Sequence, residues 1–465
     1  MGRAVSERLR RRSSAFVGDC DAYDHSMPRP FAYRGEGQLN TPREIAKIVL
    51  MCVLLVPVIR CLLLAVVVLL TLIITRLTLI GWKKGHDARG ATLPMPVWRR
   101  NILSATARAM SHCILFCFGV YRVKVIGRPD RRCKIIVSNH VSVLDGFALT
   151  SQVACMAVAK QEVEKIPLLG SVATALQFIF IDRGSSSARS DVLQQIKERT
   201  QMDGFPPLLI FPEGTTSNNT TLLRFKKGGF VAGVPVQPVA LKSRLGQLPL
   251  SAHLSLLHVY RYPWEYFDPS WTNYSPQMGG TCFRLLCQVY TSVEVTWLPV
   301  VTPTPEEAAD PQLFADNVRT TMARVMRLPI VPFSAEDSVV DGWLQSKNRT
   351  RKHIEAVDVG ISVYELKQRF NIRLEQIKVL IDEFNVIDSN KDRVLSIEEM
   401  TAYVGNDDFV RRVFFSFDSN DSGFIDYREF IIGCLTLNDE DDVSRREPLT
   451  FRDIVQRTRA LYVSS

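Results

Sequence analysis

The stretch IVSNHVSVLDG, residues 136–146, holds two residue types that could do acid–base chemistry together, His140 and Asp145. Residues five apart in one α-helix lie about 140° apart around its axis, because a turn takes 3.6 residues. The two side chains can meet if His140 lies on a loop and Asp145 in the first turn of the next helix. The carboxylate would then fix one ring nitrogen, and the other nitrogen could take a proton from a substrate hydroxyl.

This spacing taken alone also suits a structural histidine. A serine nucleophile is not favoured, since no G-x-S-x-G sequence surrounds Ser138 or Ser142. Later stretches add candidate binding groups. Arg183, in FIFIDRGSSSARS, could form paired hydrogen bonds with a phosphate. In LLIFPEGTTSN, Glu213 could order polar substrate groups and Gly214 would allow a close backbone approach.

The elements that must position these residues are short apolar runs separated by helical stretches. The runs are Lys134–Val137, Phe178–Ile181, Leu208–Phe211 and Val236–Leu241. Each is followed by Pro, Gly or polar residues, which predicts an α/β domain with buried strands. Function in such domains gathers in the loops at strand ends.

A long apolar segment, Ile48–Ile80, precedes this domain. Its 33 residues exceed the roughly 20 of one spanning helix but fall short of two. Pro57 and Arg60 stand where one long helix would break, and lysines and arginines flank both ends. Because positive charge marks the cytoplasmic side, two basic flanks favour a re-entrant hairpin, with one tilted span as the alternative and a buried soluble helix as a third. The shorter apolar stretch Cys113–Tyr121 cannot span and suits the core or the membrane surface.

The formal charge of +9 is uneven. Ile381–Asp442 holds 16 acidic and 5 basic residues, a balance of −11, so the rest of the chain carries about +20. This pattern suggests anionic partners for the basic body and a cation for the acidic part. No nucleic-acid motif accompanies the basic residues, and nucleic acid is not an expected partner. The ten cysteines form no paired C-x-x-C array, which argues against structural zinc and suits reduced thiols facing the cytosol.

Two stretches of the acidic part resemble calcium-binding EF-hand loops. The stronger, 418–429, has Gly423 at the sharp turn, and its expected ligands are Asp418, Asn420, Ser422, the Phe424 carbonyl, Asp426 and Glu429. The weaker, 388–399, offers Asp388, Asn390, Asp392, Val394, Ser396 and Glu399, but Arg393 replaces the turn glycine. Only 18 residues separate the loops, so incomplete pairing or a short connecting helix is expected.

Four blocks in order resemble the glycerolipid acyltransferases: N-H-x4-D (Asn139, His140, Asp145), I-D-R (Ile181–Arg183), F-P-E-G-T (Phe211–Thr215) and V-P-V-x-P (Val234–Pro238). The resemblance continues through Tyr262–Trp271 and Leu286–Arg319. It is nearest to the branch that acylates lysophosphatidylcholine and lysophosphatidylethanolamine, whose members often carry EF-hands. One departure is an apparent insertion, Ser243–Tyr260, which bears on acceptor specificity more than on chemistry.

The resemblance implies an α/β acyltransferase domain with an N-terminal membrane helix or hairpin, followed by an all-α EF-hand module. His140 would deprotonate a lysophospholipid hydroxyl that attacks the thioester of acyl-CoA, and Asp145 would orient His140. Arg183 would hold the acceptor's phosphate, and the acceptor site would be shaped by Glu213, Gly214 and Thr215. The expected divisions are a polar basic tail (1–42), membrane segment (43–85), acyltransferase domain (86–333), linker (334–356), EF-hand module (357–442) and C-terminal tail (443–465).

The expected partners are therefore membrane lipids, a lysophospholipid, acyl-CoA and Ca²⁺. The expected place is the membrane of the endoplasmic reticulum, and of the Golgi, with both domains facing the cytosol. A membrane-anchored calcium sensor with an inactive acyltransferase fold is the alternative from another class, and the intact His140, Asp145 and Glu213 argue against it. These motifs encode neither the head group nor the acyl chain, nor the oligomeric state.

Overall fold

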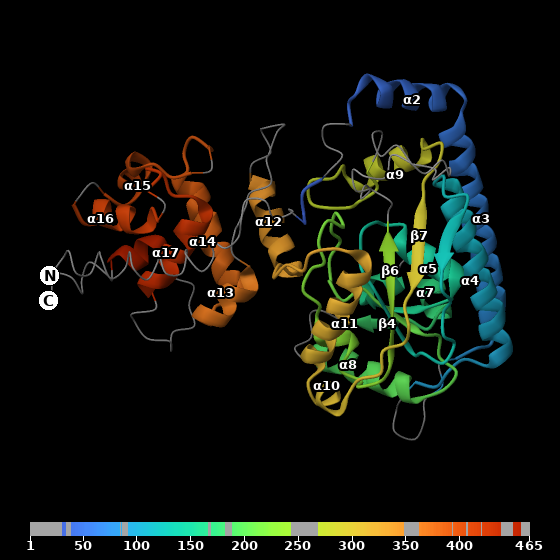
Figure 1. The fold of residues 1–465 in the computed structure, drawn as a ribbon. Helices are drawn as coiled ribbons and strands as arrows, with labels where there is room; N and C mark the ends of the chain where they lie inside the picture. Colours follow the sequence, from blue (N-terminus) through green and yellow to red (C-terminus); the bar gives the residue numbers. More distant parts are fainter. Residues whose placement is uncertain are drawn as a thin grey trace, which may run out of the picture. The chain divides into compact units, whose positions relative to one another are not determined.

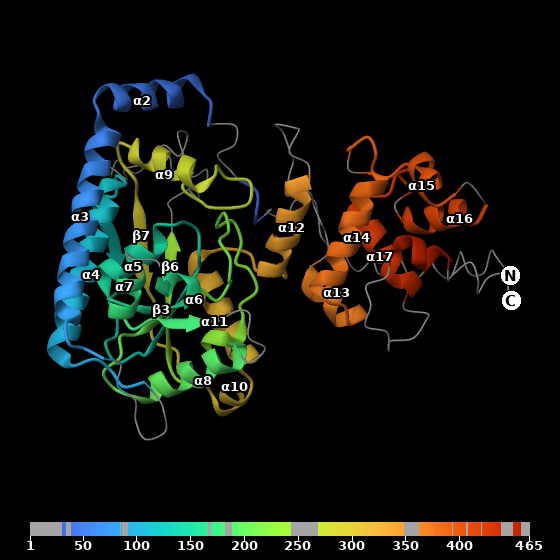
Figure 2. The ribbon, with the colours of Figure 1, turned by 180° about the vertical axis from the view of Figure 1, so that it is seen from behind.

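The computed structural model describes residues 30–33, 39–83, 85, 92–165, 169–181, 188–242, 268–347, 362–392, 394–405, 408–419, 421–438 and 450–456. The chain divides into two compact units, one of residues 30–331 and the other of residues 332–465 together with 1–29. The first contains a sheet covered by helices, and the described residues of the second are helical (Figures 1 and 2).

The first unit is built on a seven-stranded sheet in the order β1-β7-β6-β2-β5-β3-β4. The strands are β1 (Val123–Ile126), β2 (Ile135–Ser138), β3 (Met156–Lys160), β4 (Ile179–Ile181), β5 (Leu208–Ile210), β6 (Val236–Lys242) and β7 (Val293–Trp297). All pairs are parallel except β6 with β7. Because β2 lies between β5 and β6 and parallel to both, the carboxyl ends of these three strands meet at one edge.

Alternating residues of β2 explain why the sheet is covered on both faces. Ile135 and Val137 pack with residues of α11, whereas Ile136 packs with residues of α5. Successive side chains of a strand point to opposite faces, so an apolar run marks a strand buried on both sides. The helices of this unit are α2 (Pro42–Val53), α3 (Val56–Leu79), α4 (Val97–Cys117), α5 (Asp145–Gln152), α6 (Gln161–Lys165), α7 (Leu169–Ala175), α8 (Ala188–Gln201), α9 (Met278–Leu286), α10 (Pro305–Ala309) and α11 (Pro311–Met326).

The four apolar runs named from the sequence form β2, β4, β5 and β6, which confirms the mixed α/β architecture. The strands β1, β3 and β7 were not expected. The sequences VKVI and VEVTW mix apolar with charged or polar residues, and in MAVAK alanines separate the larger Met156 and Val158. Partly exposed strands of this kind are hard to recognise because only one of their faces is apolar.

The long apolar segment forms two helices with a break at Leu54–Leu55, just before Pro57. Leu55 adopts a left-handed backbone conformation (φ 55°), which a helix interior does not allow. In the described part of the chain, α3 is the helix long and apolar enough to cross a membrane. Figures 1 and 2 show it running beside α4 along one side of the unit. The choice between one span and a hairpin in the membrane stays a prediction.

Arg60 and the three threonines of α3 are buried, whereas its leucines, valines and isoleucines, with Arg76 in the last turn, are largely exposed. Arg60 is buried and donates to the carbonyls of Leu286 (2.7 Å) and Gln288 (2.6 Å) and to the Tyr121 hydroxyl (2.7 Å). The buried set also includes Thr71, Thr75 and Thr78. A broad apolar face is unfavourable in water and favourable against the hydrocarbon chains of a bilayer. The exposed apolar face of such a long helix therefore indicates association with lipid. The protein is membrane-associated.

The second unit contains α12 (Ala335–Lys347), α13 (Val363–Phe370), α14 (Leu374–Ile387), α15 (Ile397–Val404), α16 (Asp408–Phe417), α17 (Tyr427–Asn438) and helical residues 451–456. The two acidic loops lie between α14 and α15 and between α16 and α17. Leu395 and Ile425, the eighth residue of each loop, exchange backbone hydrogen bonds of 2.8 and 2.9 Å. The two loops are therefore paired at these residues, and the short connection between them is formed by α15 and α16. Of the two expected outcomes, incomplete pairing is not what the bridge shows.

Candidate active site

His140 and Asp145 meet at the carboxyl end of β2, in the arrangement that their spacing predicted. His140 lies on the loop after the strand, and Asp145 is the first residue of α5. The Nδ1 atom of His140 lies 2.9 Å from Oδ2 of Asp145. A carboxylate accepts but does not donate, so this contact places the proton of the neutral imidazole on Nδ1 and leaves Nε2 as the basic nitrogen.

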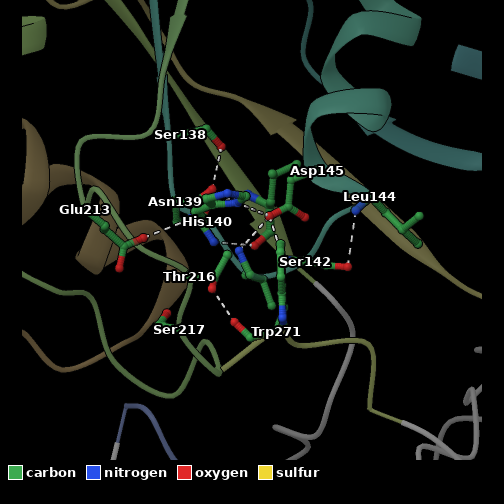
Figure 3. A network of polar contacts seen from close by, with 12 residues as sticks. Ser138, Asn139, His140, Ser142, Leu144, Asp145, Glu213, Thr216, Ser217 and Trp271 are labelled. Atoms are coloured by element: carbon green, nitrogen blue, oxygen red, sulfur yellow. Dashed lines mark hydrogen bonds and ion pairs between the residues drawn. The ribbon is translucent and has the colours of Figure 1, made fainter. Parts of the chain in front are cut away.

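Asp145 is itself held by the loop that it organises. The same Oδ2 atom accepts from the backbone N–H groups of Val141 (2.6 Å) and Ser142 (2.8 Å), as Figure 3 shows. These bonds satisfy backbone donors of the loop that leads into α5, and an acidic residue in the first turn of that helix suits the helix dipole. The aspartate therefore fixes both the loop backbone and the histidine ring.

The ring of His140 is also held by Phe211, the residue that follows β5. The two rings stack with centroids 4.1 Å apart and planes 15° apart. The His140 side chain keeps about a quarter of its surface exposed. Within the described part of the chain, no group forms a hydrogen bond with its Nε2. The ring is thus fixed on one side and one face, with its basic nitrogen available to a substrate.

Glu213, expected to contact substrate, is fully buried behind the loop. Its Oε1 accepts the backbone N–H of His140 at 3.0 Å (Figure 3). Its Oε2 accepts the backbone N–H of Leu223 at 3.2 Å. Burial raises the pKa of Glu213 to about 8, outweighing the two backbone donors, which favour the charged form. In this structure Glu213 positions the backbone of His140, and its contact with substrate stays a prediction.

Asn139 locks the end of β2 to β6. Its side-chain oxygen accepts from the backbone N–H of Leu241 at 2.8 Å, and its side-chain nitrogen donates to the Leu241 carbonyl at 2.9 Å. Two further segments close the loop: Ser217 N–H donates to the His140 carbonyl at 2.9 Å, and Trp271 N–H to that of Val141 at 2.8 Å. Sequence reasoning gave no role to Ser217 or Trp271, because backbone donors carry no residue-type signal.

The remaining expected site residues are placed as follows. Gly214 has a left-handed backbone (φ 71°), which favours glycine, and a β-carbon there would lie 3.0 Å from the Lys226 side chain. Thr215 follows it in the same loop. Arg183 lies outside the described residues, as does the insertion 243–260. The structure thus unites His140, Asp145 and the 211–215 block at one strand edge.

Comparison with known proteins agrees with this geometry. Residues 122–242, which include the histidine, the aspartate and the 211–215 block, match the family model described as Acyltransferase. The chain is 29% identical over 417 residues to "Lysophosphatidylcholine acyltransferase 2" of Homo sapiens, covering 88% of this chain and 71% of that protein. The chain is an acyltransferase.

Two further relatives extend this result. The acyltransferase is 30% identical to "Lysophosphatidylcholine acyltransferase 2" of Mus musculus, covering 74% of this chain and 60% of that protein. It is 29% identical to "Lysophospholipid acyltransferase LPEAT2" of Arabidopsis thaliana, covering 77% and 61%. The chain thus spans less than two thirds of the length of these two. The crystal structure of the 1-acyl-sn-glycerophosphate (LPA) acyltransferase PlsC from Thermotoga maritima shares 21% identity at a TM-score of 0.33, over 49% of this chain and 80% of that one.

The acidic loop 418–429 turns sharply at Gly423 and is held by its own side chains. Gly423 takes a left-handed turn (φ 81°), and the Asp418 carboxylate accepts from the N–H groups of Ser422 (2.9 Å) and Gly423 (2.8 Å). Glu429 Oε1 accepts from Ser419 N–H at 3.0 Å. Among the described residues, no three acidic, His or Cys side chains gather closely enough to hold a metal. Asn420 and Arg393 lie outside the described residues.

Proposed function

We propose that this acyltransferase moves an acyl group from acyl-CoA to the free hydroxyl of a lysophospholipid, with lysophosphatidylcholine or lysophosphatidylethanolamine as acceptor. The relatives named for lysophospholipid acylation support the acceptor class. The exposed apolar face of α3 supports an acceptor that is itself in a membrane. The observation that carries the chemistry is the Nδ1–Oδ2 contact of 2.9 Å, which leaves Nε2 as the basic nitrogen of the ring.

The proposed reaction begins at Nε2 of His140. Nε2 of His140 takes the proton of the acceptor hydroxyl as its oxygen bonds to the thioester carbonyl carbon. The tetrahedral intermediate then breaks its carbon–sulfur bond, and the imidazolium returns the proton to the leaving thiolate of CoA. The products are a diacyl phospholipid and free CoA. The negative Asp145 stabilises the imidazolium between the two steps, and no covalent enzyme intermediate is required.

The test is acyl transfer from radiolabelled acyl-CoA to a panel of lysolipids in isolated membranes. The wild type should acylate the choline or ethanolamine lysolipid, and His140→Ala should abolish transfer while its amount in the membrane stays normal. Near-normal turnover in His140→Ala would refute the mechanism. Transfer to lysophosphatidic acid alone would keep the chemistry and overturn the acceptor.

Arg183 is proposed to bind the acceptor's phosphate, on the support of its sequence block alone. A guanidinium matches a phosphate with paired hydrogen bonds. Arg183→Ala should then raise the KM for the lysolipid more than the KM for acyl-CoA. An effect limited to acyl-CoA would assign Arg183 to the donor site.

We also propose that loop 418–429 binds Ca²⁺ and that loop 388–399 binds it weakly or not at all. The first loop offers side-chain oxygens of Asp418, Ser422, Asp426 and Glu429 with a glycine at the turn, which suits calcium. In the second, Lys391 Nζ donates to the Asp388 carbonyl at 2.6 Å and so adds a positive charge inside the loop. Calorimetry on the full chain should show one tight site.

The calcium proposal is tested with two matched variants. Glu429→Gln should remove the tight site, and Glu399→Gln, at the same position of the other loop, should keep it. Two sites of equal affinity would contradict the asymmetry. Residence in the endoplasmic reticulum or Golgi with both domains on the cytosolic side is likewise a proposal, supported by the basic flanks of 48–80. Protease protection of tags at both ends in sealed microsomes tests it.

A further inference from the structure

The short helix 451–456 carries three buried apolar residues on one face. Phe451, Ile454 and Val455 are between 0% and 3% exposed and belong to the core of the helical unit. Their spacing of i, i+3 and i+4 places them along one side of a helix. Arg452, Asp453 and Gln456 are exposed. This is the pattern by which an amphipathic helix binds in a groove.

The groove is formed by the helices that flank the acidic loops. The ring of Phe451 packs 5.2 Å from that of Phe430 in α17 and 6.0 Å from that of Phe417, the last residue of α16. These two phenylalanines stand on either side of the 418–429 loop. The aromatic anchor of the helix is therefore held by both helices of the stronger calcium loop.

Polar contacts fix the beginning of the helix to α14 and α15, the helices that flank the 388–399 loop. Glu383 in α14, which is 7% exposed, accepts the backbone N–H groups of Phe451 and Arg452, the latter at 3.3 Å. Arg452 donates to the Tyr403 carbonyl at 2.9 Å, and its guanidinium lies 4.7 Å from the centre of that residue's ring in α15. The helix also caps itself, since Thr450 Oγ1 donates to Asp453 Oδ2 at 2.7 Å. An acidic acceptor at a helix start is favourable, because the first N–H groups have no partner within the helix.

We propose that α14–α17 form a helix-binding module and that residues 450–456 are its ligand, bound in cis. The fitting ligand is an amphipathic helix with an aromatic residue at its first turn, aliphatic residues three and four positions later, and a cation beside the aromatic one. The segment contacts all four helices around both loops, so any rearrangement of either loop that moves these helices also changes its binding. This proposal rests on contacts of the apolar groove and is independent of the acyl acceptor and of calcium.

A helix that is a ligand can be exchanged, whereas a helix that is an integral part of the fold cannot. The eleven residues 439–449 join it to α17. A linker of this length gives an effective concentration on the order of millimolar. If the separate peptide binds with a Kd on the order of 10 μM, the intact chain should bind an added peptide about 100-fold more weakly than a chain whose own helix has been released.

The experiment places a specific protease site within 439–449 of the full chain and adds a fluorescent peptide of residues 446–465. After cleavage, the peptide should replace the native fragment, and fluorescence polarisation should report its binding. Before cleavage, the peptide should bind the same chain about 100-fold more weakly. The Phe451→Asp peptide should not bind. The Gln456→Ala peptide, altered at an exposed position of the same helix, should bind as the wild type does.

Three results would overturn the proposal. The first is a cleaved chain that keeps its fragment and never exchanges it while its circular dichroism is unchanged. The second is unfolding of the helical unit upon cleavage, which would make the helix part of the fold. The third is equal binding of the Phe451→Asp peptide, which would show that the groove is not the binding site.

Discussion

Replacing Asp145 by asparagine separates the charge of this residue from its geometry. One oxygen, Oδ2, accepts all three hydrogen bonds, from His140 Nδ1 (2.9 Å), Val141 N (2.6 Å) and Ser142 N (2.8 Å). An asparagine can place its single oxygen at that position and keep all three. What it loses is the negative charge that stabilises the imidazolium formed in the reaction.

The size of the effect follows from the contacts. A hydrogen bond to a charged group contributes about 1.5–3 kcal/mol, against about 1 kcal/mol for a neutral one. The difference of about 0.5–2 kcal/mol acts on the state in which His140 is charged, so kcat should fall by about 2- to 30-fold, since 1.4 kcal/mol corresponds to tenfold. Asp145→Ala should do more, because it leaves the two backbone N–H groups of the loop unpaired at about 1–3 kcal/mol each. It should therefore lower the thermal stability of the domain as well as its activity.

The assay is steady-state acyl transfer in detergent with each substrate varied in turn, beside a thermal unfolding curve for each variant. Asp145→Asn should lower kcat at a nearly normal unfolding temperature, and Asp145→Ala should lower both. Asp203→Asn is the matched control, because Asp203 pairs with Lys134 at the opposite end of β2 and is exposed. Unchanged kcat in Asp145→Asn, or a change confined to the KM for acyl-CoA, would refute the proposed role of the charge.

Three further predictions concern groups that support the site and the two units. Burial raises the pKa of Glu213 to about 8, above the roughly 4.3 of a glutamate in an unfolded chain. Between these two pH values the folded protein keeps a proton that the unfolded chain has lost. The free energy of unfolding should therefore fall as the pH rises from about 4.3 to 8. Glu213→Gln cannot titrate and should show a flatter dependence of unfolding temperature on pH; an unchanged slope would assign the proton to another group. Arg60→Met should destabilise the first unit by about 2–6 kcal/mol, because the Leu286 and Gln288 carbonyls lose their donor at about 1–3 kcal/mol each. Thermal inactivation in detergent measures this, and inactivation rates equal to those of the wild type would contradict it. Gly433→Ala should destabilise the helical unit by about 1–3 kcal/mol, because the new β-carbon would overlap the buried Phe417 ring. The unfolding temperature of this variant should be lower than that of the wild type. Gly279→Ala, with open space around it, is the control, and equal curves for both would show that the ring moves aside freely.

The local features of the site were predictable from a few neighbouring residues. The run Ile135–Val137 is apolar on both faces, which indicates a strand inside a covered sheet. The five-residue step from His140 to Asp145 required a loop followed by a helix start, and α5 begins at Asp145. The break before Pro57 was also local, because proline and a left-handed residue both interrupt a helix.

The supports of the site were not predictable in the same way. Glu213 was expected at the substrate, yet its two oxygens hold the backbone of His140 and Leu223. The clamp between Asn139 and Leu241 joins residues about a hundred positions apart. Nothing in either residue type states which backbone group it will meet.

The sequence by itself determined the chemical groups, their order, and the strand, loop and helix that present His140 to Asp145, because hydrophobic period and turn residues act over a few positions. The tertiary structure alone decided the strand order that sets β5 and β6 on either side of β2, and with it the partners of Glu213 and Asn139. It also decided that Phe451, Ile454 and Val455 lie in the hydrophobic core of the second unit. The reason is physical: a buried carboxylate, amide or ring is stabilised by whichever distant backbone or side chain the packed core brings within a few ångströms.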